Sequence, residues 1–503
     1  MSDKRKAYQV LTMNTIAFTV CFAVWMMNGV LVTFLVENGV FHWDKAEIGI
    51  LIGIPVLTGS IMRLPVGVLT DKYGGKIIYT AVMVLSALPM FLMSAATEYW
   101  HFVLASLGFG LAGASFAVGI AYTSVWFSKE RQGTALGIFG AGNAGAALTS
   151  LGAPWLLQYL TDGGKTLDAW RTMPIIYAIV LLAMAAIFFF TTYSKRTEHG
   201  RGMTLRQRLA PLKYVRVWRF GLYYFLVFGG FVALAQWLIP YYVNAYTMSI
   251  ATAGLMASIF SLPSGVIRAL GGWLSDKYGA RQVMYWVFGT CLLCFIFLCV
   301  PRMEITSPGQ GIMAEKSGVV EEVSDEAIVV SGREYPLRHE SLDRPEESDV
   351  LVFPTFAFQQ VPLVEVGDHV SKRELLAKGD TQIFFQANVW IFTVLVFIVG
   401  ILMGIGKAGV YKFIPEYYPQ EVGVVGGIVG VLGGLGGFFC PIIFGYLLQS
   451  TGIWTTAWMF LFLVTIVSHL WMHSVVRRMM RQNAPTLSRQ IEDMDGTDSE
   501  AVV

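Results

Sequence analysis

Two copies of one sequence block place an arginine at the same depth of an apolar helix. Residues 63–74 read RLPVGVLTDKYG, and residues 268–279, which begin 205 residues later, read RALGGWLSDKYG. In each copy the arginine, Arg63 or Arg268, precedes the aspartate by eight residues, which is about two helical turns. A charge at that depth in a membrane is costly and usually marks a substrate path. The two related arginines therefore predict a small anion bound on the axis between two halves of the chain.

The chemistry of arginine narrows the kind of anion. A guanidinium group is planar and donates paired hydrogen bonds, so it suits a planar oxyanion better than a lysine ammonium group does. The apolar stretches around Arg63 and Arg268 contain essentially no aspartate or glutamate that could pair with them. A bound anion is then the expected counter-charge.

Composition indicates an integral membrane protein. The 503 residues are 55% hydrophobic and 14% charged, with a mean hydropathy of +0.58. About 20 apolar residues cross a bilayer, and we predict twelve such spans, near 11–36, 46–69, 77–96, 101–127, 133–160, 173–193, 219–246, 250–274, 282–300, 388–412, 422–448 and 453–475. The predicted fold is an all-α membrane protein with twelve transmembrane helices in two pseudo-symmetric six-helix halves and a small β-rich insert between helices 9 and 10.

The polar segments divide the chain and orient it. We predict an N-terminal half (1–193), a basic linker (194–218), a C-terminal half in two parts (219–302 and 388–476), an insert (303–387) and a tail (477–503). Lysine and arginine gather in the linker and in the loops on the same side. The positive-inside rule then puts that side and both termini in the cytoplasm of a bacterial inner membrane. No cleavable signal peptide is expected.

Several classes of function find no support in the motifs. All five cysteines lie in apolar spans, which favours packing over redox chemistry. We find no metal-ligand spacing, no phosphate-binding glycine loop and no Ser-His-Asp arrangement. The chain is therefore predicted to be no enzyme, to need no metal or cofactor, to bind no nucleic acid, and to work as a monomer in the lipid bilayer.

Glycines recur at matching steps in two spans, in GTALGIFG of the first half and GVVGGIVG of the second. Such density costs helix propensity, but glycines on one helix face let two backbones approach closely. The pattern favours helices that rock past a central site, with simple packing as the alternative. The six gating or coupling positions are Gly133, Gly137, Gly140, Gly423, Gly427 and Gly430.

The DKYG blocks resemble the loop 2–3 signature of the major facilitator superfamily, whose members have two six-helix halves and alternating access between them. Residues 108–147 and 404–441 resemble the paired nitrate-signature motifs of the nitrate/nitrite porter family, through their glycines, Gly142-Asn143 and the turn Ile414–Pro419. The resemblance covers both halves and leaves out the insert and the tail. It implies that Arg63 and Arg268 clamp nitrate or nitrite.

By the same resemblance, aromatic residues of spans four and seven flank the anion, and an asparagine of span five lies close to it. These positions are Phe116, Tyr224, Phe228 and Asn143. Aromatic walls exclude water, and tyrosine or asparagine donors satisfy the remaining oxygens. Ordinary packing of the phenylalanines and a helix cross-link by Asn143 are the alternatives.

Charged residues near the ends of spans are predicted to gate or couple. Asp71 and Asp276 are expected to cap or pair at helix ends and to latch the inward gate. Lys412 and Glu416, four residues apart, are expected to form an ion pair on one helix. Lys407 lies deeper and is predicted to attract anions or to respond to proton coupling.

The stretch GKAGVYKFIPEYYP resembles the nitrate/proton symporter branch more than the exchange branch of the family. The resemblance thus implies transport of nitrate and/or nitrite, coupled to protons. A nitrate/nitrite antiporter and a carrier of another small anion, such as a monocarboxylate, are the alternatives within transport. A transport-inactive nitrate sensor is the alternative of another class, against which the intact glycine motifs argue.

The segment 303–387 breaks the family pattern. Residues 303–388 carry 16 acidic and 7 basic residues, a net charge of −9, and alternate apolar and polar residues as strands do. Part of the segment resembles half of a biotinyl/lipoyl-type hammerhead but lacks the hairpin that is modified, so no carrier role is predicted. We expect it on the periplasmic side, either as a tolerated insertion or as a docking surface for a protein partner.

Overall fold

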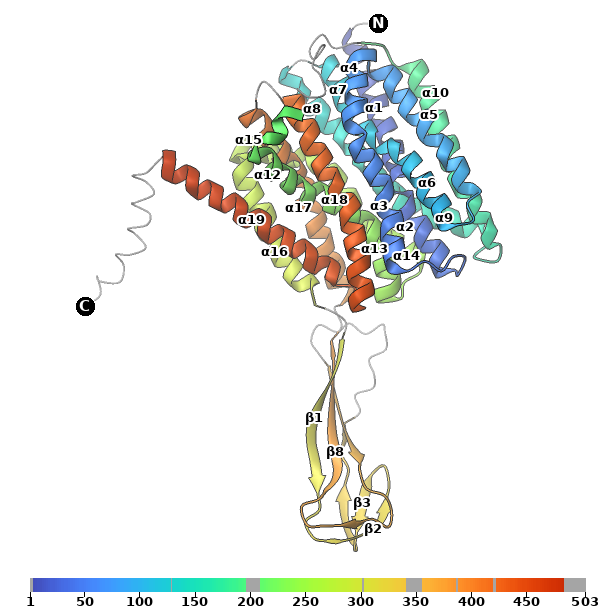
Figure 1. Cartoon of the computed structure of the whole chain (residues 1–503), viewed down its shortest axis with the longest axis vertical. Coiled ribbons are helices and arrows are strands. Elements are labelled where there is room, and N and C mark those ends of the chain that lie inside the picture. The colour runs from blue at the N-terminus through green and yellow to red at the C-terminus, as the bar shows by residue number, and fades with distance from the viewer. Residues whose placement is uncertain are drawn as a thin grey trace, which may run out of the picture. The chain divides into compact units, whose positions relative to one another are not determined.

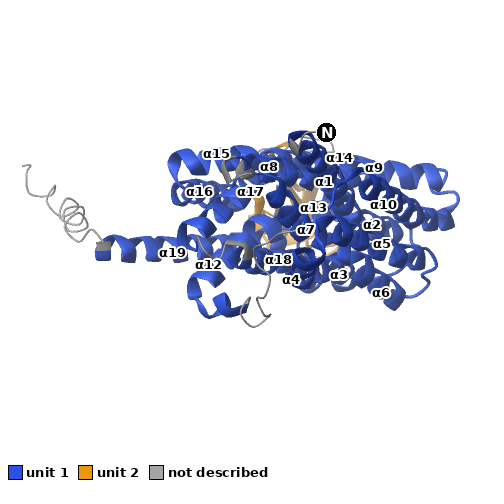
Figure 2. Cartoon of the chain, turned by 90° about the horizontal axis from the view of Figure 1, so that it is seen from above, with its two compact units in different colours: residues 1–297, 393–503 blue, residues 298–392 orange. Residues whose placement is uncertain are grey.

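A computed structural model describes residues 3–127, 129–195, 209–300, 303–340, 355–385, 388–418 and 422–483. The chain separates into two compact units, one of residues 1–297 and 393–503 and one of residues 298–392 (Figure 2). The larger unit is helical, and the smaller unit is built mainly of strands. Most of the predicted basic linker (196–208) and of the predicted tail (484–503) lies outside the described residues.

The first half of the helical unit begins at the N-terminus (Figure 1). Its helices are α1 (Asp3–Trp25), α2 (Met27–Glu37), α3 (Lys45–Ile61), α4 (Arg63–Tyr73), α5 (Gly75–Ser94), α6 (Tyr99–Phe109), α7 (Ser115–Trp126), α8 (Lys129–Gly140), α9 (Gly145–Leu160) and α10 (Thr172–Thr191), with short 3₁₀ turns η1 (Gly110–Ala114), η2 (Ala141–Ala144) and η3 (Leu167–Arg171). Asp44 caps α3 by accepting from the Glu47 N–H, while the Glu47 carboxylate accepts from the Asp44 N–H. This capping box fixes where the second span begins.

The second half repeats the arrangement. Its helices are α12 (Val215–Tyr224), α13 (Phe231–Tyr246), α14 (Ile250–Val266), α15 (Arg268–Tyr278), α16 (Ala280–Leu298), α17 (Val389–Tyr417), α18 (Val422–Thr451) and α19 (Thr456–Asn483), with the turn η4 (Ala210–Lys213) before α12 and the π-helical turn η5 (Phe225–Gly230) after it. Gly74 and Gly279 end α4 and α15 with φ angles of 90° and 84°. Because glycine adopts such angles and other residues rarely do, both DKYG blocks need their final glycine.

The predicted number of membrane spans is not confirmed. Ten helices within the described residues are long and apolar enough to cross a membrane. Helices α14 and α15 pass the same test together but are bent by 45° where they join, and counting this pair as one span gives eleven. Residues 133–160, predicted as the fifth span, lie in α8, η2 and α9, which are not among these candidates. Their many glycines, which the motif requires, make this stretch less apolar than its neighbours. The chain is nevertheless a multi-pass membrane protein.

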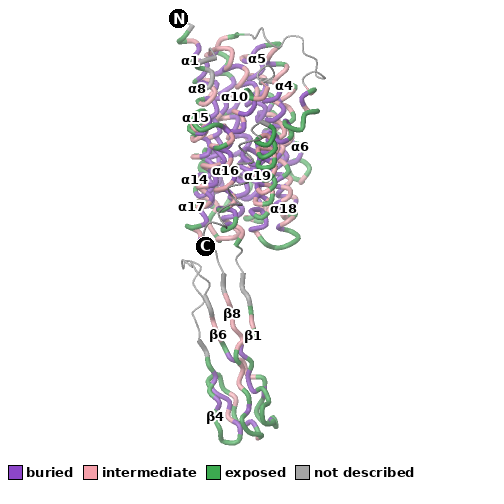
Figure 3. Tube along the Cα trace, turned by 90° about the vertical axis from the view of Figure 1, so that its left-hand side faces the viewer, coloured by how far each residue is buried: buried purple, intermediate pink, exposed green. Residues whose placement is uncertain are grey.

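The two halves meet where helix backbones nearly touch. A Cβ atom added to Gly49 of α3 would lie 2.3 Å from the carbonyl oxygen of Pro441 in α18. The pseudo-symmetric crossing of α14 with α9 is equally close, since a Cβ atom at Gly254 of α14 would lie 2.1 Å from the carbonyl oxygen of Ser150 in α9. Buried residues run along the middle of the helical unit (Figure 3). Glycine is thus needed at both crossings for the halves to pack this closely.

The smaller unit consists of two four-stranded antiparallel sheets. One has the strand order β1-β8-β6-β5 and the other β4-β3-β2-β7. The strands are β1 (Met303–Met313), β2 (Gly318–Val323), β3 (Ala327–Val330), β4 (Arg333–Pro336), β5 (His339–Glu340), β6 (Thr355–Pro362), β7 (His369–Val370) and β8 (Leu375–Phe385). A core of its own, with Val320, Ile328 and Leu376 fully buried, holds this unit together.

We predict that the helical unit folds without the strand unit. Met303 of β1 lies opposite Phe385 of β8, so the two ends of the insert are already neighbours across an antiparallel ladder. Replacing residues 306–382 with Gly-Ser-Gly should therefore give a monodisperse protein whose melting temperature equals that of the intact chain. Size-exclusion chromatography and thermal unfolding in detergent check this. Aggregation of the shortened chain would contradict the prediction and would make the insert part of the helical fold.

Candidate functional site

Arg63 lies buried at the joint between α3 and α4. It is the first residue of α4 and only 4% exposed. Its Nη1 donates to the carbonyl oxygen of Gly430 in α18 at 2.7 Å. Nε and Nη2, which form the other edge of the guanidinium, are buried and have no hydrogen-bond partner among the described residues. One two-pronged edge of Arg63 is therefore free to receive a ligand.

Arg268 occupies the equivalent joint between α14 and α15 in the second half. It is half-buried, and its Nη1 is buried without a hydrogen-bond partner in the described part of the chain. Its guanidinium carbon lies 5.4 Å from the ring centre of Phe116, and that of Arg63 lies 5.2 Å from the same ring. The sequence repeat thus brings two arginines, one from each half, against one phenylalanine.

Within the described residues, no buried acid balances these charges. The buried charged residues within the described ranges are Arg63, Arg219 and Lys407, all of them cations. Removing an ionised group from water costs several kcal/mol unless an opposite charge or good hydrogen bonds replace the solvent. The geometry therefore suits an anion that would lie between the arginines and accept from their free nitrogens.

Aromatic rings form walls beside Arg63. Tyr224 and Phe228 stack with their centroids 5.0 Å apart and their planes 5° apart, and Phe228 stacks on Phe116 at 6.3 Å. The Arg63 guanidinium carbon lies 5.0 Å from the Phe228 ring centre. Phe228 lies in the π-helical turn η5, a local distortion that often occurs at functional sites. The buried hydroxyl of Tyr224 makes no well-formed hydrogen bond to a described residue.

Asn143 supplies a second unpaired polar group. It is fully buried in η2, and both its amide oxygen and its amide nitrogen lack a hydrogen-bond partner in the described ranges. Its turn packs on α14, because a Cβ atom at Gly265 would lie 2.9 Å from the Ala144 nitrogen. Gly265 precedes Arg268 by three residues. All six residues predicted to bind the anion are thus brought to one buried region between the halves.

The glycine motifs pack crosswise on the arginine helices. A Cβ atom at Gly140 of the first half would lie 3.3 Å from the Arg268 side chain, and one at Gly430 of the second half would lie 3.8 Å from Arg63 Nη1. Gly137 and Gly427 repeat the pattern one turn away, at 4.0 Å from Ala269 and 3.8 Å from Leu64. Each half therefore leaves space for the other half's arginine. The surroundings of Gly133 and Gly423 lie outside the described residues.

Tyr411 and Trp25 are site residues that the sequence analysis missed. The Tyr411 hydroxyl donates to the carbonyl oxygen of Gly426 at 3.2 Å, and its ring meets Tyr224 edge-on at 4.9 Å and lies 5.6 Å from the Arg268 guanidinium carbon. Trp25 lies 5.8 Å from the Arg63 guanidinium carbon. A signal for Tyr411 was present, since it follows Lys407 by one helical turn. Nothing in the sequence singled out Trp25 among the 14 tryptophans.

The predicted ion pair of Lys412 with Glu416 is wrong. Lys412 of α17 pairs instead with Asp276 of α15, across two helices. Both side chains are exposed, 38% and 65%, so this contact between helices contributes at most about 1 kcal/mol. Asp71, the counterpart of Asp276, lies partly exposed in the last turn of α4.

Lys407 is fully buried in α17, against α14 and α13. Its Nζ donates to the Ser264 hydroxyl at 3.1 Å and lies 3.1 Å from the ring centre of Phe231. Ser264 precedes Arg268 by one helical turn. The side chain is thus held near the anion site by a hydroxyl and a ring, two groups that carry no formal charge.

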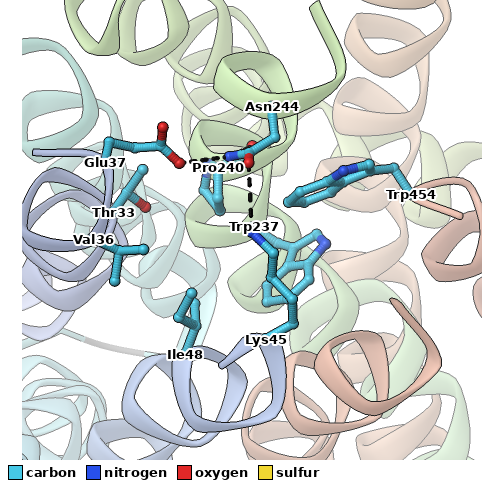
Figure 4. Close-up of a pocket in the computed structure, with 9 residues that line it drawn as sticks. All are labelled: Thr33, Val36, Glu37, Lys45, Ile48, Trp237, Pro240, Asn244 and Trp454. Carbon is cyan, nitrogen blue, oxygen red and sulfur yellow. Dashed lines mark hydrogen bonds between the residues drawn. The ribbon is translucent and has the colours of Figure 1, made fainter. Parts of the chain in front are cut away.

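A polar cluster joins the halves at Lys45, which lies at the opposite end of the Lys45–Tyr73 span from its DKYG block. Figure 4 shows its side chains. We call it the Lys45 cluster; it comprises Glu37, Lys45, Asn244 and Trp454. Asn244 of the second half donates to Glu37 at 2.8 Å and accepts from Lys45 at 3.4 Å, both residues of the first half. Lys45 Nζ also lies 5.5 Å from the Trp454 ring centre. These contacts link the two halves of the helical unit at that end.

The sequence pattern of the Major Facilitator Superfamily matches residues 13–313 and 379–493. The chain is 37% identical over 488 residues to the "Probable nitrate/nitrite antiporter NarK1" of Thermus thermophilus, covering 96% of this chain and 95% of that protein. It is 24% identical over 466 residues to the "Nitrite extrusion protein" of Bacillus subtilis, covering 92% of this chain and 94% of that protein.

Solved structures with a similar fold include a bacterial homolog of the human lysosomal transporter Spinster, in an inward-facing and occupied conformation. Its TM-score is 0.59 at 13% identity, over 94% of this chain and 97% of that one. The nucleoside transporter NupG has a TM-score of 0.58 at 12% identity, over 92% of this chain and 98% of that one. At these identities the likeness concerns the fold alone.

The packing of Tyr224 generates a prediction for anion binding. A Cβ atom at Gly433 of α18 would lie 2.1 Å from the Tyr224 ring, so Gly433→Ala should displace this wall. Overpacking of this kind costs about 1–3 kcal/mol. We expect Gly433→Ala to lower the melting temperature and to abolish its rise on addition of nitrate.

The matched control for the nitrate-dependent rise in melting temperature is Gly427→Ala on the same helix. Among the described residues a Cβ atom there meets only Leu64, at an ordinary 3.8 Å, so this variant should keep the parent's nitrate-dependent rise. A nitrate-dependent rise in Gly433→Ala as large as in the parent would show that Tyr224 does not shape the site.

Proposed function

Because the chain belongs to the nitrate/nitrite porter family of the major facilitator superfamily, we propose that it carries nitrate and nitrite across a bacterial inner membrane by alternating access. It is a transport protein, not an enzyme. One observation carries the choice of substrate. Two arginines from the two halves lie against one phenylalanine ring and have buried, unpaired guanidinium nitrogens.

The free atoms match a small planar oxyanion. Nε and Nη2 of Arg63 project from one edge of the guanidinium and reach two oxygens of one anion, as paired donors do. Arg268 Nη1 approaches from the other half, and the Tyr224 hydroxyl and the Asn143 amide are available to the remaining oxygen. Phe116 and Phe228 exclude water and limit the thickness of the slot. A flat anion with three oxygens uses every one of these groups.

Alternating access follows from where the groups come from. Each half contributes one arginine, so a bound anion draws the halves together and neutralises the repulsion between them. The crosswise glycines let α8 and α18 slide on the arginine helices with little steric hindrance. We propose that the Lys45 cluster closes the outer end, and that the Lys412–Asp276 pair helps to close the inner end. Both termini would then face the cytoplasm, as the loop cations favour.

Two observations support exchange of nitrate for nitrite as the mode of coupling. None of the buried charged residues in the described ranges is acidic, so an empty site would leave cations unbalanced as the halves move. The Thermus thermophilus relative is named an antiporter. We therefore propose exchange as the principal mode. Nitrate/proton symport, which the resemblance of the stretch around Lys407 favours, is the second candidate.

We predict that lysine cannot replace either arginine. In Arg63→Lys or Arg268→Lys a single ammonium replaces the planar fork, so charge is kept but paired hydrogen bonds are lost. The initial rate of nitrate uptake into proteoliposomes should fall at least about tenfold, because a hydrogen bond to a charged group contributes about 1.5–3 kcal/mol. Arg478→Lys, on the exposed part of α19, is the matched control and should transport normally. Near-normal uptake by both site variants would refute the arginine clamp.

The same proteoliposomes distinguish the two modes of coupling. Uptake that needs trapped nitrite and ignores an imposed proton gradient would support exchange. Uptake driven by acid outside, without internal nitrite, would instead establish symport. Nitrate binding without uptake under either condition would contradict transport and favour a sensor.

We predict that Asn244→Ala loosens the outer end of the bundle. The substitution removes the link between Glu37 and Lys45, and exposed polar pairs of this kind contribute about 0.2–1 kcal/mol. Maleimide labelling of a cysteine placed at Thr33, a buried residue that lines the same pocket, should therefore speed up about two- to fivefold.

Asn38→Ala serves as the control, because among the described residues the Asn38 side chain donates only to Phe34, within its own half. It should leave the labelling rate of the Thr33 cysteine unchanged. Equal labelling rates in Asn244→Ala and Asn38→Ala would show that the Lys45 cluster does not hold the outer end.

A further inference from the structure

Two arginines contact one tyrosine at the inner end of the second half, and a third arginine lies one helical turn from the first. We call this group the Tyr417 cluster; it comprises Arg216, Arg219, Arg281 and Tyr417. The Arg216 guanidinium carbon lies 4.5 Å from the Tyr417 ring centre, and Arg281 Nη2 donates to the Tyr417 hydroxyl at 3.2 Å. Phe220 lies beside both, 5.8 Å from Tyr417 and 5.5 Å from the Arg219 guanidinium carbon.

The charge of this cluster is unbalanced. Arg216 and Arg219 are three residues apart on α12, so they lie on one helix face. Arg219 is only 9% exposed, and it has neither an ion pair nor a hydrogen bond to any described residue. Neither Arg216 nor Arg281 pairs with an acid in the described ranges, and the nearby Asp276 is taken by Lys412. A buried, unpaired guanidinium beside two others indicates a missing anionic partner.

The helix end adds to the attraction for an anion. α12 begins at Val215, and no side chain caps its first turn. The N–H groups of a first helical turn lack partners within the helix and give that end a partial positive charge. Arg216 lies within this turn, so its guanidinium and the helix terminus favour negative charge in the same place.

The exposed neighbours identify the source of the anion. Tyr214, Val215 and Trp218, next to Arg216, are 45%, 68% and 50% exposed. The helix that starts there, through residues 215–246, is a candidate membrane span. Exposed tyrosine and tryptophan at the end of a span are typical of the membrane–water interface, at the level of the lipid headgroups. An anion held at this level beside apolar side chains is attached to a lipid.

We propose that Arg216, Arg219 and Arg281 form a binding site for the phosphate of an anionic phospholipid. The arginines donate to the phosphate oxygens, the first turn of α12 faces the same charge, and Tyr214, Val215 and Trp218 contact the glycerol and the upper acyl chain. The site is separate from the anion site between the halves. Arg219 precedes Phe228 by nine residues, which is about 13 Å along the helix.

The test uses the full-length protein in detergent, titrated with phosphatidylglycerol, with phosphatidylcholine or with inorganic phosphate, and follows the melting temperature. We expect phosphatidylglycerol to raise it and the other two to leave it unchanged. Arg216→Gln, an exposed position that should not affect folding, should raise the half-saturating lipid concentration about fivefold, since each arginine near a lipid surface contributes about 1 kcal/mol. Arg219→Gln should do the same, and Arg477→Gln on α19 should not.

Three results would overturn the proposal. One is an equal rise with phosphatidylcholine, which would mean that the headgroup charge is not recognised. Another is a rise with inorganic phosphate alone, which would assign the cluster to a soluble anion. The third is an equal lipid response in Arg216→Gln and in Arg477→Gln. The nitrate-dependent rise in Arg216→Gln should equal that of the parent, so a failure here is distinct from a failure of the transport site.

Discussion

Unbalanced positive charge in a low-dielectric interior is the constraint on which the rest of this structure depends. Arg63 and Arg268 come from different halves, and both guanidinium groups lie against the ring of Phe116. Neither has a buried acid to pair with among the described residues. Burying such groups costs several kcal/mol each unless a ligand replaces the lost water. An anion that bridges both halves lowers this cost only when the halves approach each other. The guanidinium nitrogens that bind the anion would therefore also drive the approach of the two halves.

The glycine motifs gain a specific meaning from this constraint. Glycine lowers helix propensity, so six of them at matching steps would be a weakness if they served only one helix. The structure instead sets Gly140 against Arg268 and Gly430 against Arg63, each across the boundary between halves. A Cβ atom at Gly140 would press on the Arg268 side chain at 3.3 Å, and one at Gly430 would press on the Tyr411 hydroxyl at 3.0 Å while meeting Arg63 at an ordinary 3.8 Å. The two motifs are therefore parts of one interface, which the pseudo-symmetry of the chain builds twice.

Charges outside the central site follow the polarity of their surroundings. At one end of the helical unit, Asn244 joins a carboxylate and an ammonium from the other half, and all three are close to solvent. At the other end, Arg219 is buried beside exposed aromatic residues, with no such partner in the described ranges. Exposed polar links contribute little free energy and break easily, as a gate requires. A buried unpaired arginine is a stronger indication of a ligand.

The sequence by itself determined the membrane class, the two related halves, the two arginines and the glycine steps. These features are local or repeated, so the composition of the chain, the spacing of its residues and its resemblance to a family reveal them directly. Only the tertiary structure decided which groups meet: that Phe116 serves both arginines, that Tyr411 and Trp25 join the site, and that Lys412 pairs with Asp276 rather than Glu416. The reason is physical. Helix periodicity places residues on a face, but crossing positions between helices far apart in the chain depend on the packing of the whole bundle. The same packing accommodates the glycine-rich helices α8 and α9, whose composition falls short of that of the candidate spans.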